Sequence, residues 1–273
     1  DMDKIKSEIL RFDGAIICDI TGQTRNDIIK YCFENSKRIY ISPKISDIII
    51  RGGTDINLFD SPLLLCRNSG LSFEQRLFKR IFDIVVSVIG LIILSPFMLI
   101  IAAAIKIDDG GSIIYKQKRL TINGKEFFVY KFRSMIPNAE KNGVPQLATG
   151  SDSRITRVGK FLRKCRLDEL PQLFNIIKGD MSVVGPRPER PELTEKYERE
   201  MPEFKFRLKV KAGLTGYAQV TGVYDTTPYD KLKMDLMYIE RYSMVMDLRI
   251  ILMTIKTMIS PGEMNSEADK EKY

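Results

Sequence analysis

Two adjacent carboxylates, Asp168 and Glu169, are the residues of this chain best suited to chemistry. They follow the cation-rich run Arg163–Arg166 and precede an apolar helical pattern, with Pro171 in its first turn and Gly179 as its stop. We therefore expect the pair at or near a helix N-terminus, where unpaired backbone N–H groups and the helix dipole favour anions. Asp168 should stay ionised there and a phosphate could bind beside it, so the pattern indicates phosphate chemistry. The same residues also fit an ordinary helix cap, and both interpretations can hold together.

The composition restricts the chemistry that is open to the chain. Its 273 residues are 44% hydrophobic, which is enough for a packed core, and the net charge of +8 implies an acidic partner. Nucleic acid, anionic lipid or a phosphorylated small substrate would each fit that charge. Histidine is absent, so acid–base work falls to carboxylates, lysine or tyrosine. The four cysteines have no paired spacing, which favours a reducing compartment over a metal site.

The N-terminal part of the chain predicts one β-α-β unit. It consists of a strand at 14–20, an amphipathic helix at 26–36 and a strand at 38–42. A parallel sheet needs more strands, and the chain starts at Asp1 without an initiator Met or signal peptide. We therefore interpret residues 1–70 as the tail end of a Rossmann-like domain in a fragment of a longer protein, and assign it no catalysis.

The segment 71–106 combines a basic amphipathic lead-in with a charge-free apolar run from Ile84 to Ile105. As a straight helix this run would rise roughly 33 Å, about the thickness of a bilayer core. Ser95 and Pro96 interrupt it near the middle and cations flank both ends, whereas a single span should show an asymmetry of Lys and Arg. These features favour a re-entrant helix that returns to the same face. A conventional kinked span stays open, because Pro is tolerated in such helices.

The remaining chain predicts a mixed domain at 107–262 and a polar tail at 263–273. Its elements are, in order, a hairpin around Asn123-Gly124, a long polar loop at 137–153 of the kind that often forms a lid, a basic amphipathic helix at 154–166, a strand with one basic face at 204–211, and two helices after Tyr229. The last helix carries an apolar face, which we assign to core packing, at Leu248, Ile251, Leu252, Ile255 and Ile259.

Arg187 stands between two prolines in Gly185-Pro186-Arg187-Pro188. Proline fixes the backbone on both sides, so this rigid loop can aim a guanidinium at a phosphate with little loss of entropy on binding.

Several motifs together resemble the bacterial sugar transferase family, the monotopic phosphoglycosyl transferases that start glycan assembly on polyprenyl phosphate. The resemblance covers about residues 72–260 and is carried by Lys79–Asp83, the Ser95-Pro96 break, Tyr130–Met135, Arg154–Arg163, Leu167–Leu173, Gly179–Pro188 and Gly213–Val220. Tyr217 and Ala212 depart from the family, which usually has Trp and Pro there. The expected fold class is α/β: a mixed α+β catalytic domain with a re-entrant membrane helix, preceded by a partial Rossmann-like α/β segment.

The resemblance implies a reaction at the cytoplasmic face of the bacterial inner membrane. A uridine diphosphate (UDP) sugar would give its sugar-1-phosphate to undecaprenyl phosphate and release uridine monophosphate (UMP). At matching positions Asp168 would be the nucleophile that forms a covalent phospho-sugar intermediate, and Glu169 its partner in positioning metal or acceptor. A carboxylate attacks an anionic diphosphate only if charge is neutralised, so Mg²⁺ and fixed cations are expected.

The candidates for these roles can be named. The cations expected to bind phosphate or nucleotide are Arg187, Arg133, Lys131 and Arg163. The metal candidates are Asp168 and Glu169, with Glu189 and Asp235 as further ones for metal or orientation.

The alternative is a binding or scaffold module that uses its basic faces on anionic lipid without catalysis. A carboxylate pair inside a basic ring would weaken such binding, which favours the enzyme and argues against a nucleic-acid partner. The sugar, the glycan pathway and assembly into a homo-oligomer stay open.

Overall fold

The computed structural model describes residues 2–58, 60–66, 70–136, 152, 154–222 and 226–259. The chain divides into two compact units, Asp1–Arg51 and Gly52–Tyr273. The loop expected at 137–153 lies, apart from residue 152, outside the described residues, as does the tail at 263–273.

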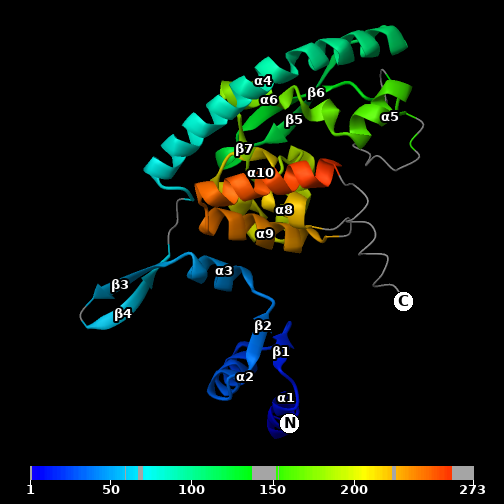
Figure 1. Cartoon of the computed structure of the whole chain (residues 1–273). Helices are drawn as coiled ribbons and strands as arrows, with labels where there is room; N and C mark the ends of the chain where they lie inside the picture. Colours follow the sequence, from blue (N-terminus) through cyan, green and yellow to red (C-terminus); the bar gives the residue numbers. More distant parts are fainter. Residues whose placement is uncertain are drawn as a thin grey trace. The chain divides into compact units, whose positions relative to one another are not determined.

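The N-terminal unit contains the expected β-α-β arrangement, drawn in blue in Figure 1. Its elements are α1 (Met2–Leu10), β1 (Gly14–Ile17), α2 (Gly22–Glu34), β2 (Arg38–Ile41) and α3 (Ile45–Arg51). β1 and β2 pair in parallel, and a small core forms from Ile9, Ile17, Ile28 and Cys32. The described sheet of this unit has two strands, so the Rossmann-like interpretation of residues 1–70 is not confirmed. After this unit, β3 (Thr54–Leu58) and β4 (Ser61–Leu65) form a local antiparallel hairpin.

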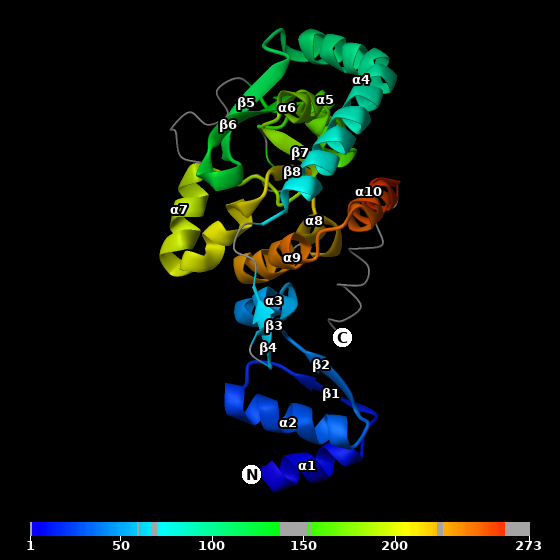
Figure 2. The same ribbon diagram turned by 90° about the vertical axis from the view of Figure 1, so that its left-hand side faces the viewer.

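One long helix, α4 (Phe73–Asp109), follows. Ser72 caps it through a capping box with Gln75, and Gly110 ends it with φ of 69°. The expected break at Ser95-Pro96 is wrong, because the helix runs through both residues. Pro96 has no N–H for the carbonyl of Ile92, and the Ser95 hydroxyl donates to that carbonyl instead at 3.0 Å. The helix follows a bent, continuous path in Figures 1 and 2.

α4 packs one face along the second unit and leaves the other exposed. Near its start, the guanidinium of Arg80 donates to the carbonyls of Ile176 and Ile177 at 2.6 and 2.7 Å. Near its end, Ile101 and Ile105 share a buried cluster with Phe132 and Leu162. The opposite face exposes large apolar side chains that include Phe78, Ile81, Val85, Ile89, Ile92, Leu99 and Ile100. Among the described residues α4 is the one helix long and apolar enough to cross a membrane by length and composition, yet both its ends contact the same body.

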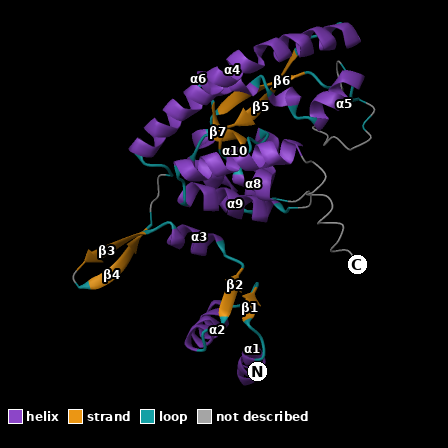
Figure 3. Ribbon diagram, in the orientation of Figure 1, coloured by secondary structure: helices purple, strands orange, loops and turns teal. Residues whose placement is uncertain are grey.

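The part of the second unit from α4 onward surrounds short sheets with helices, as Figure 3 shows. β5 (Ile114–Leu120) and β6 (Glu126–Phe132) form the expected antiparallel hairpin, and Asn123 and Gly124 adopt positive φ in its turn. β7 (Met181–Val184) and β8 (Ala212–Thr215) pair in parallel. The remaining elements are η1 (Ile122–Gly124), α5 (Arg157–Lys164), the 3₁₀ turn η2 (Leu167–Glu169), α6 (Gln172–Lys178), α7 (Pro191–Glu200), η3 (Pro202–Lys209), α8 (Tyr217–Thr221), α9 (Pro228–Glu240) and α10 (Met244–Ile259).

A buried polar network joins α4 to the centre of this unit. Asp83 of α4 accepts hydrogen bonds from the Ser182 hydroxyl and the Val183 N–H of β7, both at 2.9 Å. Lys79 of α4 pairs with Asp247 of α10 at 2.7 Å, and the Tyr238 hydroxyl donates to Asp247 at 2.8 Å. Because each buried charge has a partner, the network fixes α4 against β7 and α10.

Two sequence-based expectations are wrong in this unit. Residues 202–209 form the 3₁₀ helix η3 rather than a strand, with Phe204 and Arg207 buried at i, i+3 spacing. The apolar face of α10 is not core: Leu248, Leu252 and Ile255 are exposed, whereas Asp247 and Ile250 face inward. In both cases a charged residue is buried because it pairs with a residue distant in sequence: Arg207 with Asp235, and Asp247 with Lys79.

Candidate active site

Asp168 and Glu169 lie in the 3₁₀ turn η2, between α5 and α6. Arg166 precedes them in the left-handed region with φ of 54°, a conformation that non-glycine residues rarely adopt and that concentrates at functional sites. α6 begins at Gln172 and ends where Gly179 takes φ of 95°. The expectation that the carboxylates directly precede a helix is confirmed.

Glu169 is the centre of the ionic contacts in this region. Its Oε1 atom lies 2.7 Å from Lys131 Nζ and 2.9 Å from Arg187 Nη2, and its side chain is nearly buried. Burial opposes ionisation, but Arg187 and Lys131 outweigh it and hold the pKa of Glu169 at about 2. Glu169 therefore stays ionised at neutral pH and serves as a fixed anion for two cations.

Asp168 has a different electrostatic environment, although it is the next residue in the chain. Burial raises the pKa of its carboxyl group, and the charge of Glu169 raises it further, whereas Lys131 and Arg163 lower it. The sequence led us to expect that a helix end would favour the ionised form of Asp168, but the effect of burial on its pKa is larger. Among the described residues no ion pair involves the Asp168 carboxylate. The negative charge of Asp168 is therefore less neutralised than that of Glu169, as an attacking group requires.

Lys131 and Arg187 reach the same oxygen of Glu169 from different elements. Lys131 lies on β6, and Arg187 lies in the loop that follows β7, where its Nη1 also donates to the Gln219 side chain at 3.1 Å. A small cavity opens between them and is lined by Arg119, Val129, Lys131, Glu169, Gln172, Arg187 and Pro188. The cavity offers three cationic side chains beside Glu169, which suits a ligand with two phosphates.

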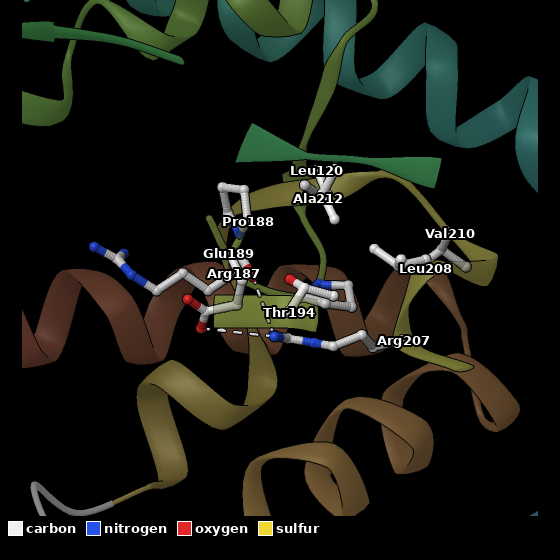
Figure 4. A pocket seen from close by; sticks show the side chains of 10 residues that line it. Leu120, Arg187, Pro188, Glu189, Thr194, Arg207, Leu208, Val210 and Ala212 are labelled. Carbon is white, nitrogen blue, oxygen red and sulfur yellow. Dashed lines mark hydrogen bonds and ion pairs between the residues drawn. The ribbon is translucent and has the colours of Figure 1, made fainter. Parts of the chain in front are cut away.

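The other expected site residues lie at varying distances from this cavity. Arg163 donates from Nε to the Ser134 hydroxyl at 3.1 Å and acts on Asp168 through its charge. Arg133 pairs instead with Asp109 at the end of α4. Glu189 and Asp235 both contact Arg207, at 3.6 and 2.7 Å, and among the ion pairs of the described residues neither involves Asp168. Figure 4 shows the contact between Glu189 and Arg207.

Arg119 is a site residue that the sequence reasoning missed. In the β5–β6 hairpin Tyr115 lies opposite Lys131, and Arg119 lies opposite Phe127. Since paired residues share a face and side chains alternate along a strand, Arg119 is on the same face as Lys131. The Asn123-Gly124 turn fixes this register, so the position of Arg119 on the face of Lys131 could have been predicted from the sequence.

The donor set fits a magnesium ion that is shared with substrate. Magnesium binds through one or two carboxylates together with substrate phosphates and does not need a cage made of protein alone. Glu169 lines the cavity, and Asp168, the preceding residue, supplies a second buried carboxylate. Across the described residues no cluster of three or more Cys, Asp or Glu side chains forms such a cage.

Comparison with known proteins gives the family. Residues 74–261 match the family model described as bacterial sugar transferase, and the chain belongs to that family. A UDP-N-acetylgalactosamine-undecaprenyl-phosphate N-acetylgalactosaminephosphotransferase of Aeromonas hydrophila is 42% identical over 185 residues, which cover 67% of this chain and 44% of the relative. A UDP-glucose:undecaprenyl-phosphate glucose-1-phosphate transferase of Klebsiella pneumoniae is 43% identical over 211 residues, which cover 76% of this chain and 43% of the relative.

The chain spans less than half the length of these two relatives. A shorter relative, the exopolysaccharide production protein PSS of Rhizobium leguminosarum bv. phaseoli, is 40% identical over 194 residues, which cover 68% of this chain and 96% of the relative. The shared region therefore corresponds to nearly the whole of that shorter family member.

Proposed function

We propose that this protein transfers sugar-1-phosphate from a UDP-sugar to undecaprenyl phosphate and so starts the assembly of a glycan. The observation that carries the proposal is the buried Asp168–Glu169 pair, with Lys131 and Arg187 held on Glu169 beside a cationic cavity. The names of the relatives state this class of reaction for those proteins.

The reaction proceeds in two balanced displacements at one phosphorus. An Asp168 oxygen attacks the sugar-bearing phosphorus, the bond to the bridging oxygen breaks, and UMP leaves with that electron pair. The resulting phospho-sugar on Asp168 is then attacked by a phosphate oxygen of undecaprenyl phosphate. This second step restores the carboxylate and yields the lipid diphosphate sugar.

The residues around Asp168 reduce the repulsion between carboxylate and diphosphate. Lys131, Arg187 and Arg119 supply positive charge in the cavity, and Glu169 fixes the first two without accepting a proton. Asp168 and Glu169 would hold Mg²⁺, which when bound supplies further charge neutralisation on the substrate phosphates.

The proposal places α4 in the cytoplasmic leaflet of the inner membrane as a re-entrant element. A helix that crosses a bilayer separates its ends by roughly 30 Å of hydrocarbon, but both ends of α4 contact one body through Arg80 and through Ile101 and Ile105. Its exposed apolar face then meets lipid, and its packed face holds the cavity at the level that a lipid-borne phosphate can reach.

Transfer can be tested with purified protein, Mg²⁺ and undecaprenyl phosphate in detergent. Labelled UDP-glucose and UDP-N-acetylgalactosamine are supplied separately, and UMP release and lipid-extracted label are measured. At least one sugar should give equal amounts of both products. Binding to anionic vesicles with no UMP release from any UDP-sugar would instead identify a membrane-binding module.

A further inference from the structure

The loop that carries Arg187 is held by its carbonyl groups. Four successive carbonyls accept hydrogen bonds from three different elements or their ends. The donors are Gly213 N–H to Pro186 at 2.9 Å, Arg207 Nη2 to Arg187 at 3.0 Å, Arg119 Nη1 to Pro188 at 3.1 Å and Leu120 N–H to Glu189 at 3.0 Å. Pro186 and Pro188 have no N–H and a fixed φ, so the backbone at Arg187 has little freedom left.

Arg207 is itself locked in place. Its Nε and Nη2 atoms lie 3.0 and 2.7 Å from Asp235 Oδ2, and its Nη1 lies 3.6 Å from Glu189 Oε1. Arg207 and Asp235 are both almost fully buried, and the guanidinium lies over the Phe204 ring at 4.9 Å. Figure 4 shows Arg207 pointing toward Glu189 beneath the loop. The guanidinium therefore bridges two carboxylates and the backbone of Arg187 at once.

We propose that Arg207 is a positioning residue for phosphate transfer, which acts by fixing the loop that carries Arg187. The proposal deepens the function proposed above and rests on it. Arg207 does not touch the cavity that holds Glu169; Arg187 does. The Arg187 side chain is 46% exposed and contacts Glu169 and Gln219, so its aim depends on where the backbone holds its Cα atom.

A lysine at position 207 would keep the charge but lose the planar fork. A single ammonium cannot reach Asp235, Glu189 and the Arg187 carbonyl in the present directions. A displacement of about 1 Å in a positioned group can cost on the order of a hundredfold in rate. We therefore expect Arg207→Lys to lower kcat/KM for the UDP-sugar by about ten- to a hundredfold.

A double-mutant cycle separates positioning from general destabilisation. In the Arg187→Lys background the planar guanidinium of Arg187 is already lost. Adding Arg207→Lys there should lower kcat/KM by less than about threefold. Arg80→Lys is the matched control, because Arg80 also donates to two carbonyls, those of Ile176 and Ile177, away from the loop. Its effect should be equal in both backgrounds. An equal loss from Arg207→Lys in both backgrounds would overturn the proposal.

Hydrogen exchange of the substrate-free protein gives a second readout that needs no turnover. The amides of Gly213 and Leu120 donate to the loop, so Arg207→Lys should speed their exchange while Arg80→Lys leaves it unchanged. Unchanged exchange in Arg207→Lys would contradict the positioning role. A wild-type protein that releases no UMP would overturn the proposed function, and the exchange comparison would still decide whether Arg207 fixes the loop. If the Arg207→Lys variant does not fold, Asp235→Asn, which weakens the ion pair that holds Arg207, repeats both measurements.

Discussion

At the scale of single residues, the site divides two neighbouring carboxylates between two tasks. Glu169 is bound by Lys131 and Arg187, which keeps its pKa at about 2, whereas burial raises the pKa of Asp168. A carboxylate with a raised pKa holds its electron pairs less tightly and is the better nucleophile. The permanently ionised neighbour organises the cations that the diphosphate needs.

Replacing Glu169 with Gln should remove the anion that holds both cations. We expect transfer to fall by about a hundredfold and the free energy of unfolding to fall by about 1–3 kcal/mol, because two ion pairs to a buried group are lost. UMP release and urea denaturation measure the two effects. The stability difference should vanish as the pH falls from about 4.5 toward 2, since the wild-type carboxylate is then protonated as well. Wild-type rates in Glu169→Gln would refute the assignment.

The pH dependence of the first step reports on Asp168. Its ionised form attacks, so single-turnover UMP release should be lost as the pH falls through a pKa above the ordinary aspartate value of 3.8. Lys131 lowers that pKa, so Lys131→Met should move the acidic limb of the profile to higher pH. A limb that stays in place or moves to lower pH would show that another group titrates.

At the scale of elements, local patterns predicted more than long-range pairings did. The Asn123-Gly124 turn, the amphipathic pattern at 154–166 and the stop at Gly179 are local, and the hairpin, α5 and α6 are confirmed. The basic face expected at 204–211 failed because Arg207 finds Asp235 on α9, a partner that alternation of residue types cannot reveal. The expectation that Arg133 lies beside the carboxylates failed for the same reason. Its partner is Asp109, which is 24 residues away in sequence.

α10 is a second element for which the sequence pattern predicted the wrong buried face. The apolar face that it leaves exposed could contact a membrane. Periodicity identified its apolar face, but Asp247 is the residue that the fold buries, through Lys79 and Tyr238. Leu248 and Leu252 are left 50% and 67% exposed. Figure 2 shows α10 and α4 along one side of this unit and α7 on the other. The exposed charges of α10 are cationic, Arg249 and Lys256, which suits an anionic lipid surface.

We therefore expect Leu252→Glu to weaken binding to anionic vesicles several-fold while thermal stability is kept, because the exposed side chain contributes little to the core. Phe33→Glu is the matched control, an exposed apolar residue of the N-terminal unit, and should bind as the wild type does. Vesicle flotation measures both variants. Equal binding of Leu252→Glu and wild type would remove α10 from the membrane face.

At the scale of the whole molecule, the position of α4 determines how the site meets its lipid substrate. Both ends of the helix are tied to one unit, by Arg80 and the Lys79–Asp247 pair at the start and by Ile101 and Ile105 at the end. The sequence predicted an apolar helix with like-charged flanks, which fits this arrangement. It could not show that the Ser95 hydroxyl would compensate the carbonyl freed by Pro96 and keep the helix continuous.

This arrangement predicts that the two flanks of α4 lie on the same side of the membrane. Arg76 and Ile107 are exposed at its two ends, and each can be changed to Cys in a background without the native cysteines. A membrane-impermeant thiol reagent added to inverted vesicles should label both positions. Labelling of only one would show that the helix spans.

The most direct test of the central claim is the mass of the protein after mixing with a UDP-sugar in the absence of lipid acceptor. The account predicts a gain of one sugar-phosphate, located by peptide analysis on Asp168, that disappears on addition of undecaprenyl phosphate and never forms in Asp168→Asn. An undiminished adduct in Asp168→Asn, or one located on a different residue, would contradict it.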